Sequence, residues 1–291
     1  MARGKGMDHE ELGTVVYTPD SLLRRPAKLF ATMAADLGRA RGLAYRLAAR
    51  DLKAQYRSSL LGYLWAFITP LMTTLVWVFM SSTGVIRIAD TGMPYPVFVF
   101  TGTMLWQVLV EAVSMPQQQV SGAQSMLVKL NFPRESILLA GLLKVGLNAA
   151  IRMAVLIPVV LFFGVLPDAR LLLLPLALAA LIVVGSAVGL LLVPIGSLYA
   201  DIGRVIPMAM QVLMYLTPVV YAMPQEGLLA TFFRLNPLTP LVLTGRAWLT
   251  GAPTPMPEHF LLVAAAGLAL LLVGWLLFRL AIAVLVERMG S

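Results

Sequence analysis

A run of 29 residues without a charged side chain, at positions 58–86, constrains this chain more than any other feature. In a helix, about 20 apolar residues cross the hydrocarbon core of a bilayer, so this run is long enough to span a membrane. The residues before it are strongly basic, because 11 of the 22 Lys and Arg lie within positions 1–61. Lys and Arg accumulate on the cytoplasmic side of membranes, which places the N-terminus inside. The run therefore predicts an integral membrane protein.

Composition excludes several classes of function. Hydrophobic residues make up 59% of the chain and charged residues 12%, against about 25% charged in ordinary soluble domains. The net charge of +8 is concentrated beside a span, where anionic lipid head groups attract it, so membrane lipids and not nucleic acid are the expected partner. The chain has no cysteine, which excludes disulfides and thiol chemistry. No P-loop, carboxylate pair or histidine cluster is found, so we expect no catalytic residue, metal site or cofactor in this chain.

Five further apolar segments predict an all-α fold with six transmembrane helices. After the run at 58–86 they cover about 96–115, 136–166, 171–200, 205–225 and 260–278. Residues 226–258 separate the last two, and their uncharged centre at 235–245 is too short to cross a membrane. Pro237 and Pro240 interrupt this centre and disfavour one continuous helix. We expect a short re-entrant hairpin there that serves as an external gate; a loop lying flat on the outer surface is the alternative.

Six spans with the N-terminus inside place the C-terminus inside as well. Sixteen Lys and Arg then fall in inside segments, while Arg87, Arg170, Arg234 and Arg246 fall in outside ones. This asymmetry supports a multi-pass protein of the inner (plasma) membrane with both termini cytoplasmic. The expected organisation is a cytoplasmic segment at 1–40, an interfacial helix at 41–59, a six-span domain at 60–284 and a cytoplasmic tail at 285–291.

The expected interfacial helix has two distinct faces. Four basic residues recur at helical spacing on one face: Arg46, Arg50, Lys53 and Arg57. Apolar and aromatic residues gather on a second face about 125° away: Tyr45, Ala48, Leu52 and Tyr56. A basic stripe beside an apolar face is typical of a helix lying on a membrane surface. A solvated cytoplasmic helix is the alternative.

Polar residues lie at intervals of four along one face of the third predicted span: Lys144, Asn148 and Arg152. A cation within a bilayer costs about 2.5–3.5 kcal/mol on insertion scales and usually faces a bundle interior or an aqueous path. Two interpretations stay open. The residues line a path for an anionic substrate, or they pair with Glu111, pair with backbone carbonyls or extend to the surface.

Three aromatic residues are further candidates for lining a path: Tyr63, Trp106 and Tyr221. Sugar rings stack on aromatic side chains, so a path for glycans would favour them. Trp and Tyr also gather at membrane interfaces, which is the alternative.

Two motifs carry a family resemblance. The sequence RDLK at 50–53 with QYRSSLLGYLW at 55–65, and KLNFPRE at 129–135, resemble the permeases of polysaccharide-exporting ABC transporters. These are type-2 exporters of O-antigen, capsule and teichoic-acid chains. The resemblance covers about 40–291 and is consistent with six spans. An adjacent gene encoding an ATPase with Walker motifs would settle this class.

The resemblance implies a homodimer that pairs with two copies of a separate ATPase subunit, which binds ATP and Mg²⁺. It also implies a lipid-linked polysaccharide as substrate and a coupling segment at about 117–135 that docks on the ATPase. The coupling residues would be Lys129, Phe132, Pro133, Arg134 and Glu135. An ordinary inside loop is the alternative for this segment. For the whole chain, the alternatives are a same-fold exporter of drugs, haem or small lipids, or an ATP-independent channel or secondary transporter.

Overall fold

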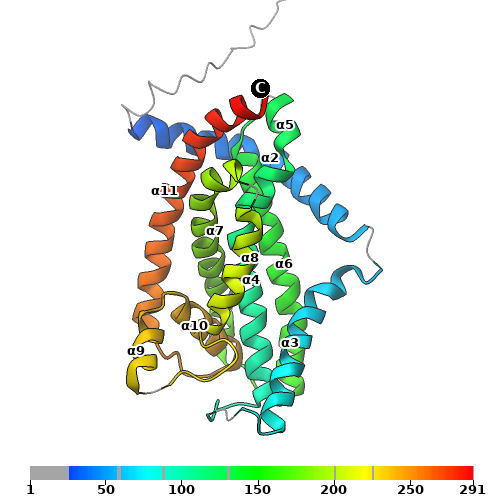
Figure 1. Ribbon diagram of the computed structural model, residues 1–291, viewed down its shortest axis with the longest axis vertical. Helices are drawn as coiled ribbons and strands as arrows, with labels where there is room; N and C mark the ends of the chain where they lie inside the picture. Colours follow the sequence, from blue (N-terminus) through cyan, green and yellow to red (C-terminus); the bar gives the residue numbers. More distant parts are fainter. Residues whose placement is uncertain are drawn as a thin grey trace, which may run out of the picture.

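The computed structural model describes residues 26–57, 60–86, 89–129, 132–199, 201–224 and 226–290. Within these residues all regular elements are helices (Figure 1). They are α2 (Pro26–Arg57), α3 (Trp65–Ser82), α4 (Tyr95–Gly122), α5 (Gln124–Lys129), α6 (Glu135–Phe162), α7 (Leu174–Leu198), α8 (Ile202–Tyr215), α9 (Gly227–Leu235), α10 (Leu238–Thr250) and α11 (Pro257–Gly290), with 3-10 turns η1 (Gly62–Leu64) and η2 (Ala169–Leu173) before α3 and α7.

Among the described residues, five helices are long and apolar enough to cross a membrane, namely α3, α4, α6, α7 and α11. The fifth predicted span, at 205–225, differs from the prediction. Its helix α8 has only 14 residues and ends at Tyr215, and the chain is irregular from 216 to 224. Pro218 explains the early end, because proline donates no backbone hydrogen bond and clashes with the preceding turn of a helix.

Helix α4 is the centre of the bundle and packs against α3, α6, α7, α8 and α10. In its most apolar part 83% of the residues are buried, against 11% in α3 and 17% in α11. Small residues allow close helix contacts: Gly185 and Gly189 of α7 lie against α4, and Gly267 and Gly274 of α11 lie against α7. The helices α4, α7 and α11 thus form a tightly packed layer, and α3 exposes most of its apolar surface.

The two ends of the bundle carry different elements (Figure 1). Helices α2, α5 and the end of α11 lie at one end, and α9 and α10 with the segment between α3 and α4 lie at the other. Following the predicted topology, we name these the cytoplasmic end and the outer end.

Helix α2 is longer than the predicted interfacial helix at 41–59, since it already begins at Pro26. It lies across the cytoplasmic end and packs on α6 through a third face that the sequence analysis missed. Half of its buried residues are alanine: the face contains Met33, Asp36, Ala40, Ala44, Leu47 and Ala48, and it shares Ala48 with the predicted apolar face. The basic residues Arg46, Arg50, Lys53 and Arg57 are exposed, as is Tyr45 of the predicted apolar face. The side chain of Tyr56 lies outside the described residues.

Candidate functional site

The predicted coupling segment forms the cytoplasmic tip between α4 and α6. Lys129, at the end of α5, is exposed. Phe132 is only partly exposed, because it packs against an apolar cluster that includes Ile137 of α6 and Phe278 of α11. The carbonyl of Pro133 accepts a hydrogen bond from the Ser136 hydroxyl at 2.6 Å, in the first turn of α6. Of the predicted docking residues, Lys129 is therefore presented outward, while Phe132 is held by the chain's own core.

Three charged side chains from distant parts of the sequence meet behind this tip. Arg279 of α11 donates to Asp36 of α2 at 2.9 Å and to Glu135 of α6 at 2.8 Å. All three side chains are at most 12% exposed. A guanidinium shared by two buried carboxylates makes strong charge-assisted hydrogen bonds. This cytoplasmic charge cluster therefore ties α2 and α11 to the first residue of α6.

Of these three residues, only Glu135 was predicted from the sequence, as part of the KLNFPRE motif, whereas Asp36 and Arg279 were missed. One local signal for Asp36 does exist. It is an acidic residue at helical spacing with Met33, Ala40 and Ala44, so it belongs to the buried face of α2. Its partner cannot be found locally, because Arg279 lies near the other end of the chain.

A second polar cluster joins α4 and α6 inside the bundle. Glu111 accepts hydrogen bonds from Asn148 at 2.5 Å and from Arg152 at 2.7 Å. The side chains of Arg152 and Glu111 are 11% and 19% exposed. Asn148 and Arg152 are thus paired with Glu111, which is part of the second interpretation given above. Lys144 is partly exposed and has no ion pair with any residue in the described ranges.

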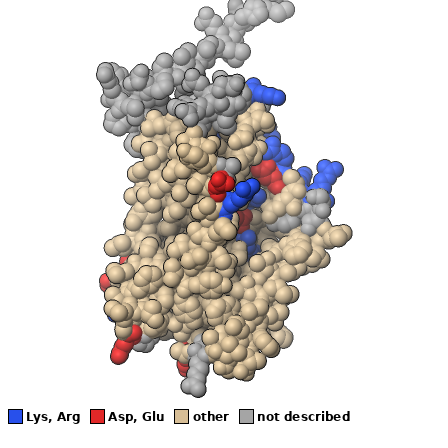
Figure 2. Space-filling model, viewed as in Figure 1, with Lys and Arg blue, Asp and Glu red and all other residues tan. Residues whose placement is uncertain are grey.

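Charged side chains are sparse on the face of the molecule seen in Figure 2. There, acidic and basic side chains gather at the rim and inside one recess, in the half nearer the cytoplasmic end. A few acidic side chains also lie along the edge of this face toward the outer end, and the area between these groups is uncharged (Figure 2).

At the outer end, the irregular residues 216–221 form what we call the outer break. Four carbonyl groups of this break, and that of Tyr215 just before it, accept hydrogen bonds from side chains. The pairs, donor first, are Tyr221 to Tyr215, Asn236 to Leu216 at 2.8 Å, Arg246 to Pro218 at 3.3 Å, Arg246 to Val219, and Tyr95 to Val220 at 2.9 Å. These donors replace the backbone bonds that the helix end leaves unmade.

Arg246 corrects one detail of the predicted topology. The charge analysis places it in an outside loop, but the structure buries it in α10 with 3% of its surface exposed. The other predicted outside residues, Arg170 and Arg234, are exposed. Arg87 lies outside the described residues.

The predicted re-entrant hairpin consists of two helices, α9 and α10. Pro237 lies at the N-cap of α10 and Pro240 lies in its first turn. Helix α10 extends to Thr250, beyond the predicted centre at 235–245, and is buried almost throughout. Helix α9 is mostly exposed, with only Ala230 and Phe233 buried.

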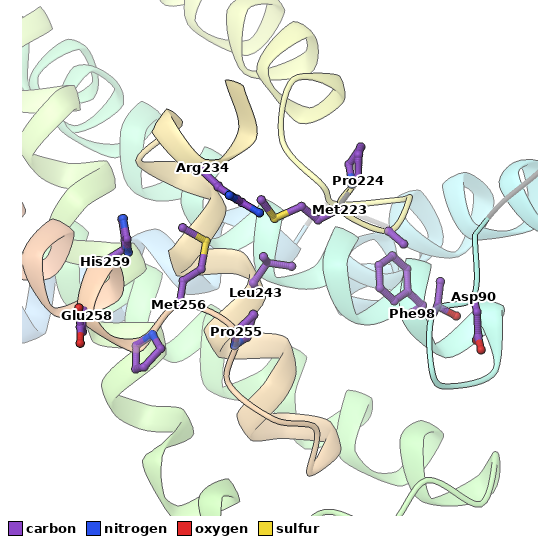
Figure 3. A pocket seen from close by; sticks show the side chains of 13 residues that line it. Asp90, Phe98, Met223, Pro224, Arg234, Leu243, Pro255, Met256, Glu258 and His259 are labelled. Atoms are coloured by element: carbon purple, nitrogen blue, oxygen red, sulfur yellow. The ribbon is translucent and has the colours of Figure 1, made fainter. Parts of the chain in front are cut away.

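A cavity of about 630 Å³ lies beside this hairpin. Figure 3 shows its lining: Arg234 on α9, Leu243 on α10, Phe98 on α4, and Met256 in the segment before α11. Arg234 extends across the cavity toward Met223, which follows the outer break (Figure 3). The cavity therefore separates part of α9 from the rest of the outer end, whereas α10 is packed into the bundle.

The three aromatic candidates occupy different environments. Tyr63 in η1 is 41% exposed. Tyr221 is partly buried, and its ring centroid lies 5.8 Å from that of Phe233 in α9. Trp106 is 1% exposed, inside the core around α4. The structure therefore does not support Trp106 as a residue that lines a path.

The architecture defines a helical, multi-pass membrane protein with several candidate spans. In the part of the chain that the structure describes, no group of acidic or histidine side chains could hold a metal ion. Residues 43–247 match the ABC-2 type transporter family, and the chain belongs to this family. It is thus a membrane permease, a transmembrane subunit without a catalytic domain, and the family implies a partnering ATPase subunit.

Similar proteins carry more specific names. The chain is 25% identical over 240 residues to the O-antigen export system permease protein RfbA of Myxococcus xanthus, covering 81% of this chain and 91% of the relative. It is 24% identical over 234 residues to the O-antigen export system permease protein RfbA of Klebsiella pneumoniae, covering 79% of this chain and 88% of the relative.

Proposed function

We propose that this chain is the channel-forming subunit of an ATP-driven exporter that moves a lipid-linked polysaccharide, such as O-antigen or capsule, across the inner membrane. The similarity to two permeases named for O-antigen export carries the proposal, because it covers about four fifths of this chain and about nine tenths of each relative. The protein would then serve lipopolysaccharide synthesis or a related pathway.

The proposed assembly is a homodimer with two ATPase subunits, which bind ATP and Mg²⁺. One protomer offers only one side of a path, and a two-fold dimer would supply the other. Helices α3 and α8 leave apolar side chains uncovered, among them Leu75, Phe79, Met208 and Val212. Such uncovered faces are compatible with a second copy or with lipid. Both termini would lie in the cytoplasm, as the charge asymmetry indicates.

The cytoplasmic tip is the proposed site of ATPase coupling. Lys129 is exposed there, and Glu135 is tied to α2 and α11 through Arg279. A displacement of the tip would therefore act directly on the interfacial helix and on the last span. This arrangement supports the coupling role that the KLNFPRE motif implies.

The experiment that tests the function is reconstitution of the chain with its ATPase subunit in liposomes. ATP-dependent movement of a polyprenyl-diphosphate-linked glycan should require both proteins. An ATPase variant lacking its Walker lysine is the matched control. Stimulation of ATP hydrolysis by drugs, haem or small lipids, with none by the glycan, would replace this proposal with the same-fold alternative.

A further inference from the structure

Arg246 is a buried guanidinium without a buried counter-ion. No carboxylate among the described residues lies within ion-pair distance of it. Its partners are instead the carbonyls of Pro218 and Val219 and the ring of Phe98, whose centroid is 3.7 Å from Cζ. Backbone dipoles and an aromatic face can stabilise a cation that has lost its hydration. A group this costly to bury indicates a specific role at this position.

The position of Arg246 depends on a glycine in α4. A Cβ atom at Gly102 would overlap both Nη2 of Arg246 and the carbonyl of Val219. The absence of a side chain at 102 therefore allows α4, α10 and the outer break to meet at one point. Tyr95, two turns earlier in α4, adds its bond to Val220 on the same segment.

Helix α10 is also fixed on its other side. Its residues from Thr239 to Thr250 are buried with the exception of Leu243. An ideal Cβ at Gly245 would lie 3.7 Å from the Cβ of Ala177 in α7, at ordinary contact distance. Helix α10 thus belongs to the packed bundle and not to a loose hairpin.

Helix α9 contrasts with α10. Leu228, Leu229 and Leu235 are 91%, 63% and 78% exposed. The helix begins at Gly227, whose φ of +88° lies in the left-handed region that favours glycine. Only Ala230 and Phe233 of α9 are buried, and Arg234 lines the cavity of about 630 Å³. Few buried contacts and an adjoining cavity are the properties of an element that opens locally.

We infer that Arg246 is a positioning residue of the outer gate. It joins α4, α10 and the outer break into one block, and α9 is the part of the hairpin that moves against this block. The inference rests on the proposed transport function. It makes α9 the moving element of the gate, in place of the predicted centre at 235–245.

The first test measures ion leakage in liposomes that contain the purified chain with its ATPase subunit but no glycan. Arg246→Met should raise the leakage several-fold, because the outer break loses two of its donors. Arg170→Met is the matched control, since Arg170 also donates to a carbonyl at the outer end, that of Ala252 at 2.9 Å, but is exposed. Arg246→Lys should leak less than Arg246→Met, because an ammonium group still reaches one carbonyl. Equal leakage of the Arg246→Met and Arg170→Met variants would overturn the inference.

The second test uses the absence of native cysteine and needs no change at Arg246. A disulfide between Ala177→Cys and Gly245→Cys fits the Cβ separation that disulfides require, about 3.5–4.5 Å. It should leave transport unchanged, because α10 stays fixed. A bifunctional thiol reagent that bridges Arg234→Cys and Met256→Cys across the cavity should stop transport, with the unbridged variant active. Loss of transport with the disulfide, or full transport with the bridge, would contradict the inference.

The gate inference and the proposed substrate can be rejected independently of each other. Leakage requires no substrate, so it reports on the gate even if the wild-type complex exports no polysaccharide. Absence of polysaccharide export with a leakage difference between the Arg246 and Arg170 variants would reject the substrate and keep the gate.

Discussion

Arg279 in α11 and Glu135, the first residue of α6, form a hydrogen-bonded ion pair of 2.8 Å across 144 positions of sequence. The same guanidinium binds Asp36 of α2. The end of the predicted coupling segment is thus bonded to the last span, and through it to α2. A displacement of Glu135 would therefore reach both helices through these two bonds.

The first prediction concerns the stability of this cluster. Arg279→Met leaves two buried carboxylates without their shared cation, so the chain should lose about 3–5 kcal/mol of stability, as measured for broken buried ion pairs. Glu135→Gln keeps an acceptor for Arg279 and should cost much less. Thermal unfolding of the purified protein in lipid nanodiscs measures both.

A control for this prediction exists at the same end of the bundle. Arg204 pairs with Asp201, but both side chains are more than 80% exposed. Arg204→Met should therefore change stability by less than about 1 kcal/mol. Equal unfolding temperatures for Arg279→Met and Arg204→Met would show that the cluster does not hold the helices together.

The second prediction separates docking from folding at the cytoplasmic tip. Lys129→Glu reverses an exposed charge and should weaken co-purification of the ATPase subunit while leaving the unfolding temperature unchanged. Phe132→Ala should weaken co-purification and, unlike Lys129→Glu, also lower the unfolding temperature, because Phe132 packs against the chain's own core. Arg204→Glu, another exposed charge reversal at this end, serves as control. Normal co-purification of the Lys129 variant would remove this residue from the docking surface.

The third prediction concerns the pair of Glu111 and Arg152. Glu111→Gln should destabilise the chain, because it leaves a guanidinium buried beside a neutral amide. Adding Arg152→Met should recover part of that loss, so the two changes should couple by about 0.5–3 kcal/mol in a double-mutant cycle. Thermal unfolding of the four proteins gives the coupling. Strict additivity would mean that the ion pair contributes nothing to the bundle.

Much of the architecture was predictable from the absence of charge. A run such as 58–86 can be buried in lipid whatever its neighbours do, so spans emerge from composition alone. The basic stripe from Arg46 to Arg57 also survives in the structure, since exposed charges need no tertiary partner. The length of α2 was missed because its packing face relies on alanine, which carries little hydrophobic signal.

The contacts that hold the two ends were less predictable. The bonds of Arg279 and of Arg246 join segments far apart in sequence, and helical spacing reports only on neighbours within one helix. Arg246 was misplaced because a charge count treats every cation between spans as exposed. Only the packed structure, in which Gly102 leaves room beside the outer break, shows why this cation is inside.

The last prediction concerns Lys144, a polar candidate for the transport path in α6. Asn148 and Arg152 are bound to Glu111, whereas Lys144 is partly exposed and makes no ion pair within the described ranges. An intramembrane cation needs a carboxylate, backbone carbonyls, water or an anionic group beside it. Because the described residues provide Lys144 with no carboxylate partner, water or an anionic substrate is the expected one. Cysteine introduced at 144 should therefore react with a charged, membrane-impermeant thiol reagent when the complex turns over ATP. Cysteine at Leu147, which is 47% exposed on the helix surface, is the control and should stay unreactive because it faces lipid. If cysteine at neither position reacts with the reagent, at rest or during ATP hydrolysis, Lys144 lies outside the path. Its ammonium group would then extend to the membrane interface.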